Sequence, residues 1–199
     1  MRDRFFFPLA ATVAGVFVLM ALQPWADRPP TGPVSAGGRN AEDITVTGKE
    51  LYRFVPGNYD GIAIVTPPEG GEPVLRITRL ANEEYQEPRS GPHIVLDADI
   101  ENAFETRPVE VEIVARAAGD FAAQEFQANY FARHEGESGW QTFVLTPQWE
   151  THRFRFNVPK IGDSAGYDYV GIRPELSDKR RTMELKSLRI HAVGPKKTD

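Results

Sequence analysis

The stretch from Gly139 to Val193 constrains the fold most, because polar and apolar residues alternate through much of it. A period of two is typical of a β-strand with one face in a core and the other in water. It predicts strands over 152–158, 167–173 and 183–193. Pro159 to Gly166 is rich in Pro, Gly, Asp and Ser and is predicted to be a loop.

The chain before this stretch also has the pattern of short strands separated by turns rich in proline and glycine. No segment after the N-terminal apolar run has a sustained helical period, although Ala117 to Gln124 could form one helical turn. The predicted fold class is therefore all-β: an antiparallel β-sandwich (jelly roll) preceded by one N-terminal transmembrane helix and a Pro/Gly linker. The predicted earlier strands are 44–46, 51–55, 61–66, 74–80, 93–100, 109–117, 125–134 and 142–145.

The last third of the chain has a recognisable arrangement. Trp149 opens an alternating strand, a proline-containing loop follows, and the sequences VGIRPEL and LKSLRIHAV form the last two strands. Over 139–193 this pattern resembles the C-terminal half of jelly-roll carbohydrate-binding modules of the galactose-binding-domain-like superfamily. The resemblance implies that fold and suggests a polysaccharide ligand. Since one fold hosts many functions, the function must be argued from the site.

The N-terminus predicts a membrane anchor. Residues 1–4 form a basic cytoplasmic head, and residues 5–22 carry no charge. As a helix, the uncharged run would span about 27 Å, close to the hydrocarbon thickness of a bilayer. The prediction is a single-pass inner-membrane protein with its N-terminus inside and its C-terminal domain periplasmic or extracellular. A cleaved signal peptide is the alternative, although Pro24 and Trp25 at the junction disfavour cleavage.

Residues 23–42 are rich in proline and glycine and contain few apolar side chains. This composition predicts a linker without regular secondary structure. The β-sandwich domain is then predicted over 43–195, with a tail at 196–199.

Charge and cysteine content exclude several classes of function. The formal net charge of −5 argues against a nucleic-acid partner, which would need a basic surface. The sequence contains no cysteine, so disulfides, thiol chemistry and cysteine-ligated metals are excluded.

Sorting the strands by face separates a core from a candidate binding surface. The predicted core residues are Val109, Val111, Ile113, Phe126, Ala128, Tyr130, Phe154, Phe156, Val170 and Ile172. The opposite faces carry amides, guanidinium groups and tyrosines, which can bond sugar hydroxyls and stack on pyranose rings. The alternative is a plain solvated sheet face. If the strands share one sheet, the candidate ligand-binding residues are Gln127, Asn129, Arg133, Trp140, Arg155, Tyr169 and Arg173.

The two tryptophans in this region have different predicted roles. Trp149 is predicted to pack in the core, as the resemblance implies. Trp140 lies at a loop mouth, where it either stacks on a ligand at the rim of the sandwich or packs against the sandwich edge.

No metal or cofactor is predicted. The resembled modules often hold a structural calcium, and Glu42, Asp43 and Glu50 lie near the start of the domain. Leu185 to Leu188 offers no acidic ligand where the family often has one, so a structural calcium at this place would lack that ligand. Asp97, Asp99 and Glu101 are predicted to form a charged strand edge rather than a cation site.

The sequence does not predict an enzyme. The four histidines are scattered without a metal-ligand spacing, and no nucleophile has a recognisable base beside it. His152 is predicted to lie on the inward face of its strand.

Two functions remain. The first is non-catalytic recognition of an envelope or extracellular polysaccharide or glycoconjugate. The alternative is an accessory or structural subunit of a membrane protein complex that uses the sandwich for protein contacts. A glycan site should be concave with exposed ring faces, whereas a protein interface should be larger and flatter.

Overall fold

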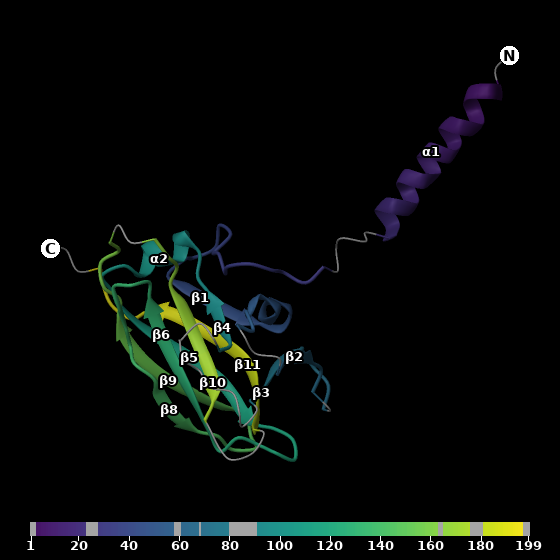
Figure 1. Cartoon of the computed structure of the whole chain (residues 1–199). Coiled ribbons are helices and arrows are strands. Elements are labelled where there is room, and N and C mark those ends of the chain that lie inside the picture. Colours follow the sequence, from purple (N-terminus) through teal and green to yellow (C-terminus); the bar gives the residue numbers. More distant parts are fainter. Residues whose placement is uncertain are drawn as a thin grey trace. The chain divides into compact units, whose positions relative to one another are not determined.

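The computed structural model describes residues 3–22, 28–57, 61–67, 69–79, 91–162, 165–175 and 181–196. The chain divides into two compact units, Met1–Pro30 and Thr31–Asp199. The first contains helix α1 (Asp3–Leu22), coloured purple in Figure 1. Among the described residues, no helix combines the length and the apolar character that crossing a bilayer requires. The anchor over 5–22 therefore stays a prediction.

The second unit is a sandwich of two antiparallel sheets (Figure 1). Within the described residues, one sheet has six strands, ordered β2 (Ile62–Val65), β3 (Val74–Arg79), β11 (Arg181–Ala192), β5 (Pro108–Ala117) and β9 (Glu150–Asn157), with β1 (Asp43–Thr47) also paired to β11. The other has five, ordered β4 (His93–Val95), β10 (Tyr169–Pro174), β6 (Glu125–Ala132) and β7 (Gly136–Glu137), with β8 (Gln141–Val144) also paired to β6. The predicted β-sandwich is confirmed.

The core lies between the two sheets and contains the residues that alternation had assigned to it. Fully buried predicted core residues are Val109, Val111, Ile113, Phe126, Ala128, Tyr130, Val170 and Ile172. Phe154 is also buried, and Phe156 is half-buried and packs against the cluster. Since these side chains point inward, their neighbours in sequence point outward.

Two segments predicted as strands are helical. Residues 48–53 form a 3-10 helix, η1 (Gly48–Arg53), where a strand over 51–55 was expected. The strand expected over 93–100 ends at Val95, and helix α2 (Ala98–Phe104) follows. Ile100 and Phe104 are four residues apart on one helix face and are both fully buried.

The charged strand edge predicted from Asp97, Asp99 and Glu101 is therefore wrong. Asp97 is the N-cap of α2, and its side chain accepts a hydrogen bond from Ala98 N. Asp99 accepts hydrogen bonds from Ser35 and from Ala36 N, and Glu101 is fully buried.

Part of the predicted linker belongs to the folded domain. The compact unit begins at Thr31, and Val34 is buried in its core. Val34 N donates to Val95 O at 2.8 Å, and Val34 O accepts from Asp97 N at 2.8 Å. A segment rich in proline and glycine can thus join the sandwich through its backbone, without the side-chain alternation that marks a strand.

Candidate functional site

The candidate ligand residues do not all share a sheet. β6 and β10 belong to the five-stranded sheet, whereas β5 and β9 belong to the six-stranded sheet. Arg155 lies on β9, is exposed, and donates to Glu110 Oε2 at 2.7 Å. Arg155 is therefore separated from the other candidates, which lie on or beside the five-stranded sheet.

On the five-stranded sheet, the strand register brings several candidates together. Val170 and Ile172 of β10 face the core, so Tyr169 and Arg173 face outward. The outward pairs across β10 and β6 are Tyr169 with Phe131, Gly171 with Asn129, and Arg173 with Gln127. This outer face therefore has two rings at one end, an amide in the middle and a guanidinium group at the other end.

Arg173, Gln127 and Trp140 form one cluster on this face. Arg173 Nε and Nη2 both donate to Gln127 Oε1, at 3.0 and 2.8 Å. The Arg173 guanidinium lies 3.8 Å from the centre of the Trp140 ring. Trp140 also crosses Gly171, where an added Cβ would lie 3.1 Å from Trp140 Cη2. Trp140 thus packs on the sheet face and remains half-exposed.

Asn129 sits beneath the surface and organises a neighbouring turn. Its side chain is fully buried, and Nδ2 donates to Glu137 Oε2 at 2.8 Å. Its Oδ1 accepts a hydrogen bond from the Ser138 hydroxyl at 2.9 Å. Ser138 Oγ in turn accepts from Tyr130 N at 3.0 Å. Asn129 therefore positions Glu137, which was not predicted as a site residue.

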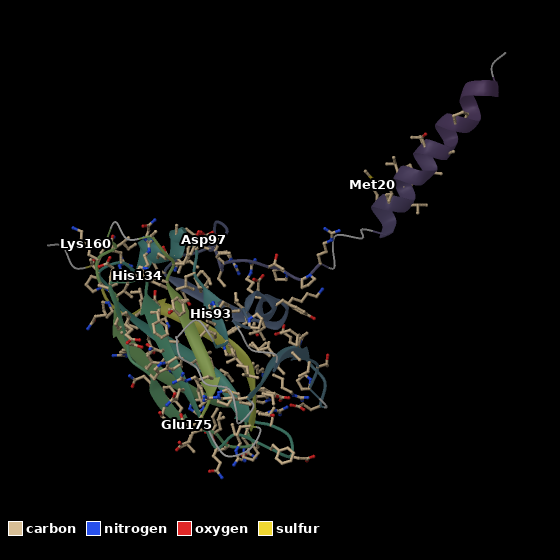
Figure 2. All side chains as sticks on the ribbon, viewed as in Figure 1. Met20, His93, Asp97, His134, Lys160 and Glu175 are labelled. Atoms are coloured by element: carbon tan, nitrogen blue, oxygen red, sulfur yellow. The ribbon has the colours of Figure 1, made fainter. Side chains whose placement is uncertain are left out.

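A pocket of about 320 Å³ opens where β6 meets β7. We call it the rim pocket, and its lining residues are Phe131, Arg133, His134, Gly136, Glu137 and Tyr169. The Phe131 and Tyr169 rings stack with their centres 4.5 Å apart. His134 is exposed (Figure 2). It lies at the end of the sandwich that carries α2, because the neighbouring Arg133 pairs with Glu101 of that helix. The pocket reaches the size range of small-ligand sites.

A buried ionic network lies beside the rim pocket. Arg133 forms an ion pair with Glu101, and Glu101 Oε1 accepts from Asp168 N at 2.6 Å. Tyr130 donates its hydroxyl hydrogen to Asp168 Oδ2 at 2.8 Å. Burial raises the pKa of Asp168 to about 6 and raises the pKa of Tyr130 well above its usual range.

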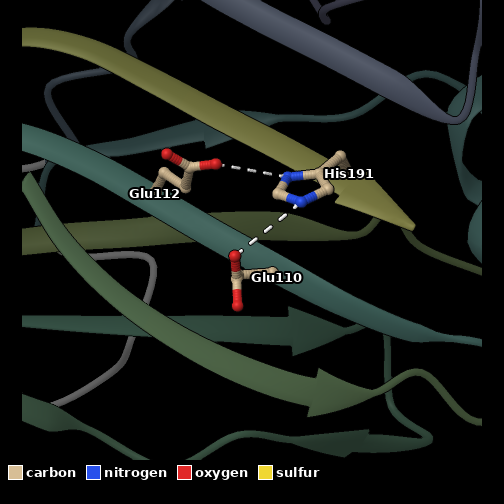
Figure 3. Close-up of side chains that lie close together, drawn as sticks. All are labelled: Glu110, Glu112 and His191. Carbon is tan, nitrogen blue, oxygen red and sulfur yellow. Dashed lines mark ion pairs between the residues drawn. The ribbon is translucent and has the colours of Figure 1, made fainter. Parts of the chain in front are cut away.

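The outer face of the six-stranded sheet holds a different charged cluster. His191 lies between two carboxylates, with Nε2 3.8 Å from Glu110 Oε1 and Nδ1 3.6 Å from Glu112 Oε1 (Figure 3). These three side chains could contribute ligands to a metal ion. However, Glu110 pairs with Arg155, and Glu112 pairs with both Arg153 and Arg189. Because the carboxylates face different ring nitrogens and are already paired, the arrangement is that of an ion-pair network.

The prediction that Trp149 packs in the core is wrong. Its side chain is half-buried, and the Arg116 guanidinium lies 4.3 Å from its ring centre. Arg116 follows the core position Ala115 on β5, so it faces outward. Trp149 therefore covers an arginine on the outside of the six-stranded sheet.

His152 faces the core as predicted. Its ring centre lies 5.1 Å from that of Phe126 and 5.5 Å from that of Phe143. Burial lowers the pKa of His152, because an apolar environment disfavours the charged imidazolium.

The acidic residues considered for calcium each pair with an arginine. Glu42 pairs with Arg107 at 2.7 Å, and Asp43 pairs with Arg189 at 2.7 Å. Glu50 pairs with Arg53 within η1. Calcium binding, which the sequence left open, stays untested.

Comparison with known proteins gives the fold but no family. No protein-family model and no curated protein sequence matches this chain. The xylan-binding domain CBM22-1 of Xyn10C from Paenibacillus barcinonensis is similar in structure, with a TM-score of 0.50 and 11% identity over 76% of this chain and 94% of that domain. The tandem CBM22-1-CBM22-2 domain of the same protein matches with a TM-score of 0.50 and 12% identity over 73% of this chain and 42% of that one. The chain therefore has the jelly-roll fold of carbohydrate-binding modules.

Proposed function

We propose that this protein is a non-catalytic, carbohydrate-binding-like module that recognises an envelope or extracellular polysaccharide or glycoconjugate. The observation that carries the proposal is the rim pocket. Phe131 and Tyr169, both largely buried, form its apolar wall, and Arg133, His134 and Glu137 provide hydrogen-bonding groups around it. A few polar groups beside an apolar surface are typical of small-ligand sites.

The fold likeness supports the same class of function without identifying the sugar. Jelly-roll domains that bind xylan have this architecture, but the identity of 11% to the xylan-binding domain speaks only to fold. The half-exposed Trp140 supports a longer binding surface, because it continues the ring surface along the same sheet face.

Glycan-array binding by the full-length chain in mild detergent tests the proposal. His134→Ala and Tyr169→Ala should weaken binding to any glycan that the wild type retains, since both residues line the rim pocket. Arg155→Ala is the matched control, because it removes an exposed arginine on the other sheet. Failure of the wild type to retain any glycan, including those of its native envelope, would refute the proposal.

Membrane anchoring is part of the proposal, with the N-terminus cytoplasmic and the domain periplasmic or extracellular. Support comes from the uncharged run over 5–22 and the arginines at positions 2 and 4. Alkaline carbonate extraction should leave the full-length chain in the membrane pellet. Release into the soluble fraction would contradict the anchor and leave the glycan proposal standing.

The alternative function is that of an accessory subunit in a membrane protein complex. In its favour, Phe121 and Val144 are apolar and more than half exposed. Folded proteins commonly expose single apolar residues, so the rim pocket is the stronger observation. A pull-down of the full-length chain from native membranes distinguishes the two functions. A stoichiometric protein companion without co-eluting glycan would favour the accessory subunit.

A further inference from the structure

Glu137 is the rim-pocket carboxylate whose charge is not balanced. Among the described residues its side chain makes no ion pair, and the one hydrogen bond of that side chain is the contact with Asn129. Arg133 is the pocket's arginine, and its charge is balanced by buried Glu101. A ligand in the rim pocket therefore meets the unbalanced negative charge of Glu137, whereas the positive charge of Arg133 is already neutralised by Glu101.

The Glu137 carboxylate is also held in a fixed orientation. Asn129 is fully buried and donates to Glu137 Oε2 at 2.8 Å. The Asn129 amide is itself held in place, because its Oδ1 accepts from the Ser138 hydroxyl and Ser138 Oγ accepts from Tyr130 N. Glu137 Oε1 is left to accept hydrogen bonds from a ligand. Because the carboxylate is oriented before binding, little conformational entropy is lost when the ligand arrives.

The surrounding charges reinforce the negative sign of this site. Behind the pocket, Glu101 forms the ion pair with Arg133, and the carboxyl of Asp168, which accepts from Tyr130, is a further acid near that guanidinium. The whole chain carries a formal net charge of −5. An anionic ligand therefore meets repulsion from Glu137 and from the protein as a whole, whereas an ammonium group is attracted.

We propose, building on the function above, that Glu137 selects saccharides by charge. The pocket favours a sugar that carries a primary amine, accepts a neutral sugar, and excludes one that carries carboxylates. A carboxylate can accept hydrogen bonds from sugar hydroxyls in all three cases. Only the protonated amine adds an ion pair with the carboxylate, and only the acid adds repulsion.

Three hexasaccharides with one β-1,4-linked glucan backbone test the inference: cellohexaose, fully deacetylated chitosan hexaose, and the corresponding hexamer of glucuronic acid. Calorimetric titration of the full-length chain at low ionic strength should give a chitosan Kd roughly fivefold below that of cellohexaose, as expected for a partly exposed ion pair. The acidic hexamer should bind weakest. Added salt should reduce both differences.

Glu137→Gln is the decisive variant, because it removes the charge and keeps an oxygen that can accept from Asn129. The three Kd values should converge in this variant. Glu135→Gln is the matched control, since Glu135 is a nearby exposed acid outside the rim pocket, and it should preserve the wild-type order.

The outcomes separate the two proposals. If the wild type binds none of these hexasaccharides or any arrayed glycan, the proposed function fails, and the charge selection fails with it. If it binds cellohexaose and the acidic hexamer equally well, charge selection is overturned and carbohydrate binding stands. Retention of the wild-type order by Glu137→Gln would also overturn it.

Discussion

The Arg173 guanidinium lies 3.8 Å from the centre of the Trp140 ring, on the outer face of the five-stranded sheet. The same guanidinium donates two hydrogen bonds to Gln127. Arginine, amide and indole thus stabilise each other across β10, β6 and the residue that precedes β8. Gln127 and Arg173 therefore support this sheet face, and under the proposed function direct contact with a ligand falls mainly to the rim pocket.

Arg173→Lys should lower the free energy of unfolding by about 1 kcal/mol. Lysine keeps the charge but cannot form the two hydrogen bonds to Gln127 or stack as a planar group on Trp140. Urea unfolding measures the effect. Arg155→Lys, in an exposed ion pair, is the control and should cost less than about 0.5 kcal/mol. Equal losses in both variants would contradict the supporting role of Arg173.

Gly171→Ala should destabilise the protein by about 1 kcal/mol, because a small overpacking change forces neighbours to move. The added Cβ would lie 3.1 Å from Trp140 Cη2. Trp140→Phe removes that atom, so the cost of Gly171→Ala should largely disappear in the Trp140→Phe background. Thermal unfolding of the four proteins in this double-mutant cycle measures the coupling. Additive effects would show that the two side chains do not compete for space.

Asp168 should make the folded state more stable as the pH falls from about 6 to about 4. Its pKa is raised from 3.8 to about 6 in the folded protein, so the folded state binds this proton more tightly than the unfolded state does. The full effect corresponds to at most about 3 kcal/mol. Other carboxylates act in the opposite direction, since Arg189 lowers the pKa of Asp43 and Arg155 lowers that of Glu110.

The contribution of Asp168 is therefore measured as a difference from Asp168→Asn. Urea unfolding of both proteins between about pH 4 and 7 should show the wild type gaining stability relative to the variant as the pH falls. A difference that stays constant with pH would rule out a raised pKa at Asp168.

Glu101→Gln should destabilise the protein by about 3 kcal/mol, because it leaves the Arg133 guanidinium without its buried counter-charge. Glu101 is fully buried, and the Arg133 side chain is only 17% exposed. Glu110→Gln is the control, because its partner Arg155 is 69% exposed and the pair is screened by water. Similar unfolding midpoints for the two variants would contradict the importance of the Arg133–Glu101 pair.

The sandwich was predictable because alternation survives wherever one strand face meets the core. Val109, Val111 and Ile113 illustrate this, since all three are fully buried. The sequence pattern did not predict helix α2, because Asp97, Asp99 and Glu101 alternate by chance as in a strand. The helix buries only two apolar side chains, Ile100 and Phe104, which is too few to show a helical period. Short helices of this kind have too few turns for their period to be visible.

The candidate site was only partly predictable, because alternation assigns a residue to a strand face but not to a sheet. Arg155 and Tyr169 both lie on outward faces, yet strand pairing places them on different sheets. Glu137 was missed for another reason. It lies in a two-residue strand within a glycine-bounded turn, and its importance depends on buried Asn129, a contact that no local pattern reveals.

The entry of the chain into the sandwich also has a mechanical consequence. Arg53 Nη1 donates to the carbonyl oxygens of Thr31, Gly32 and Pro33, and Val34 bonds on either side of Leu96. A pulling force applied to the chain ahead of Thr31 would act first on these Arg53 and Val34 hydrogen bonds. These hydrogen bonds would break before the core strands bear tension. The segment 31–34 would therefore detach first and protect the core strands from small pulling forces.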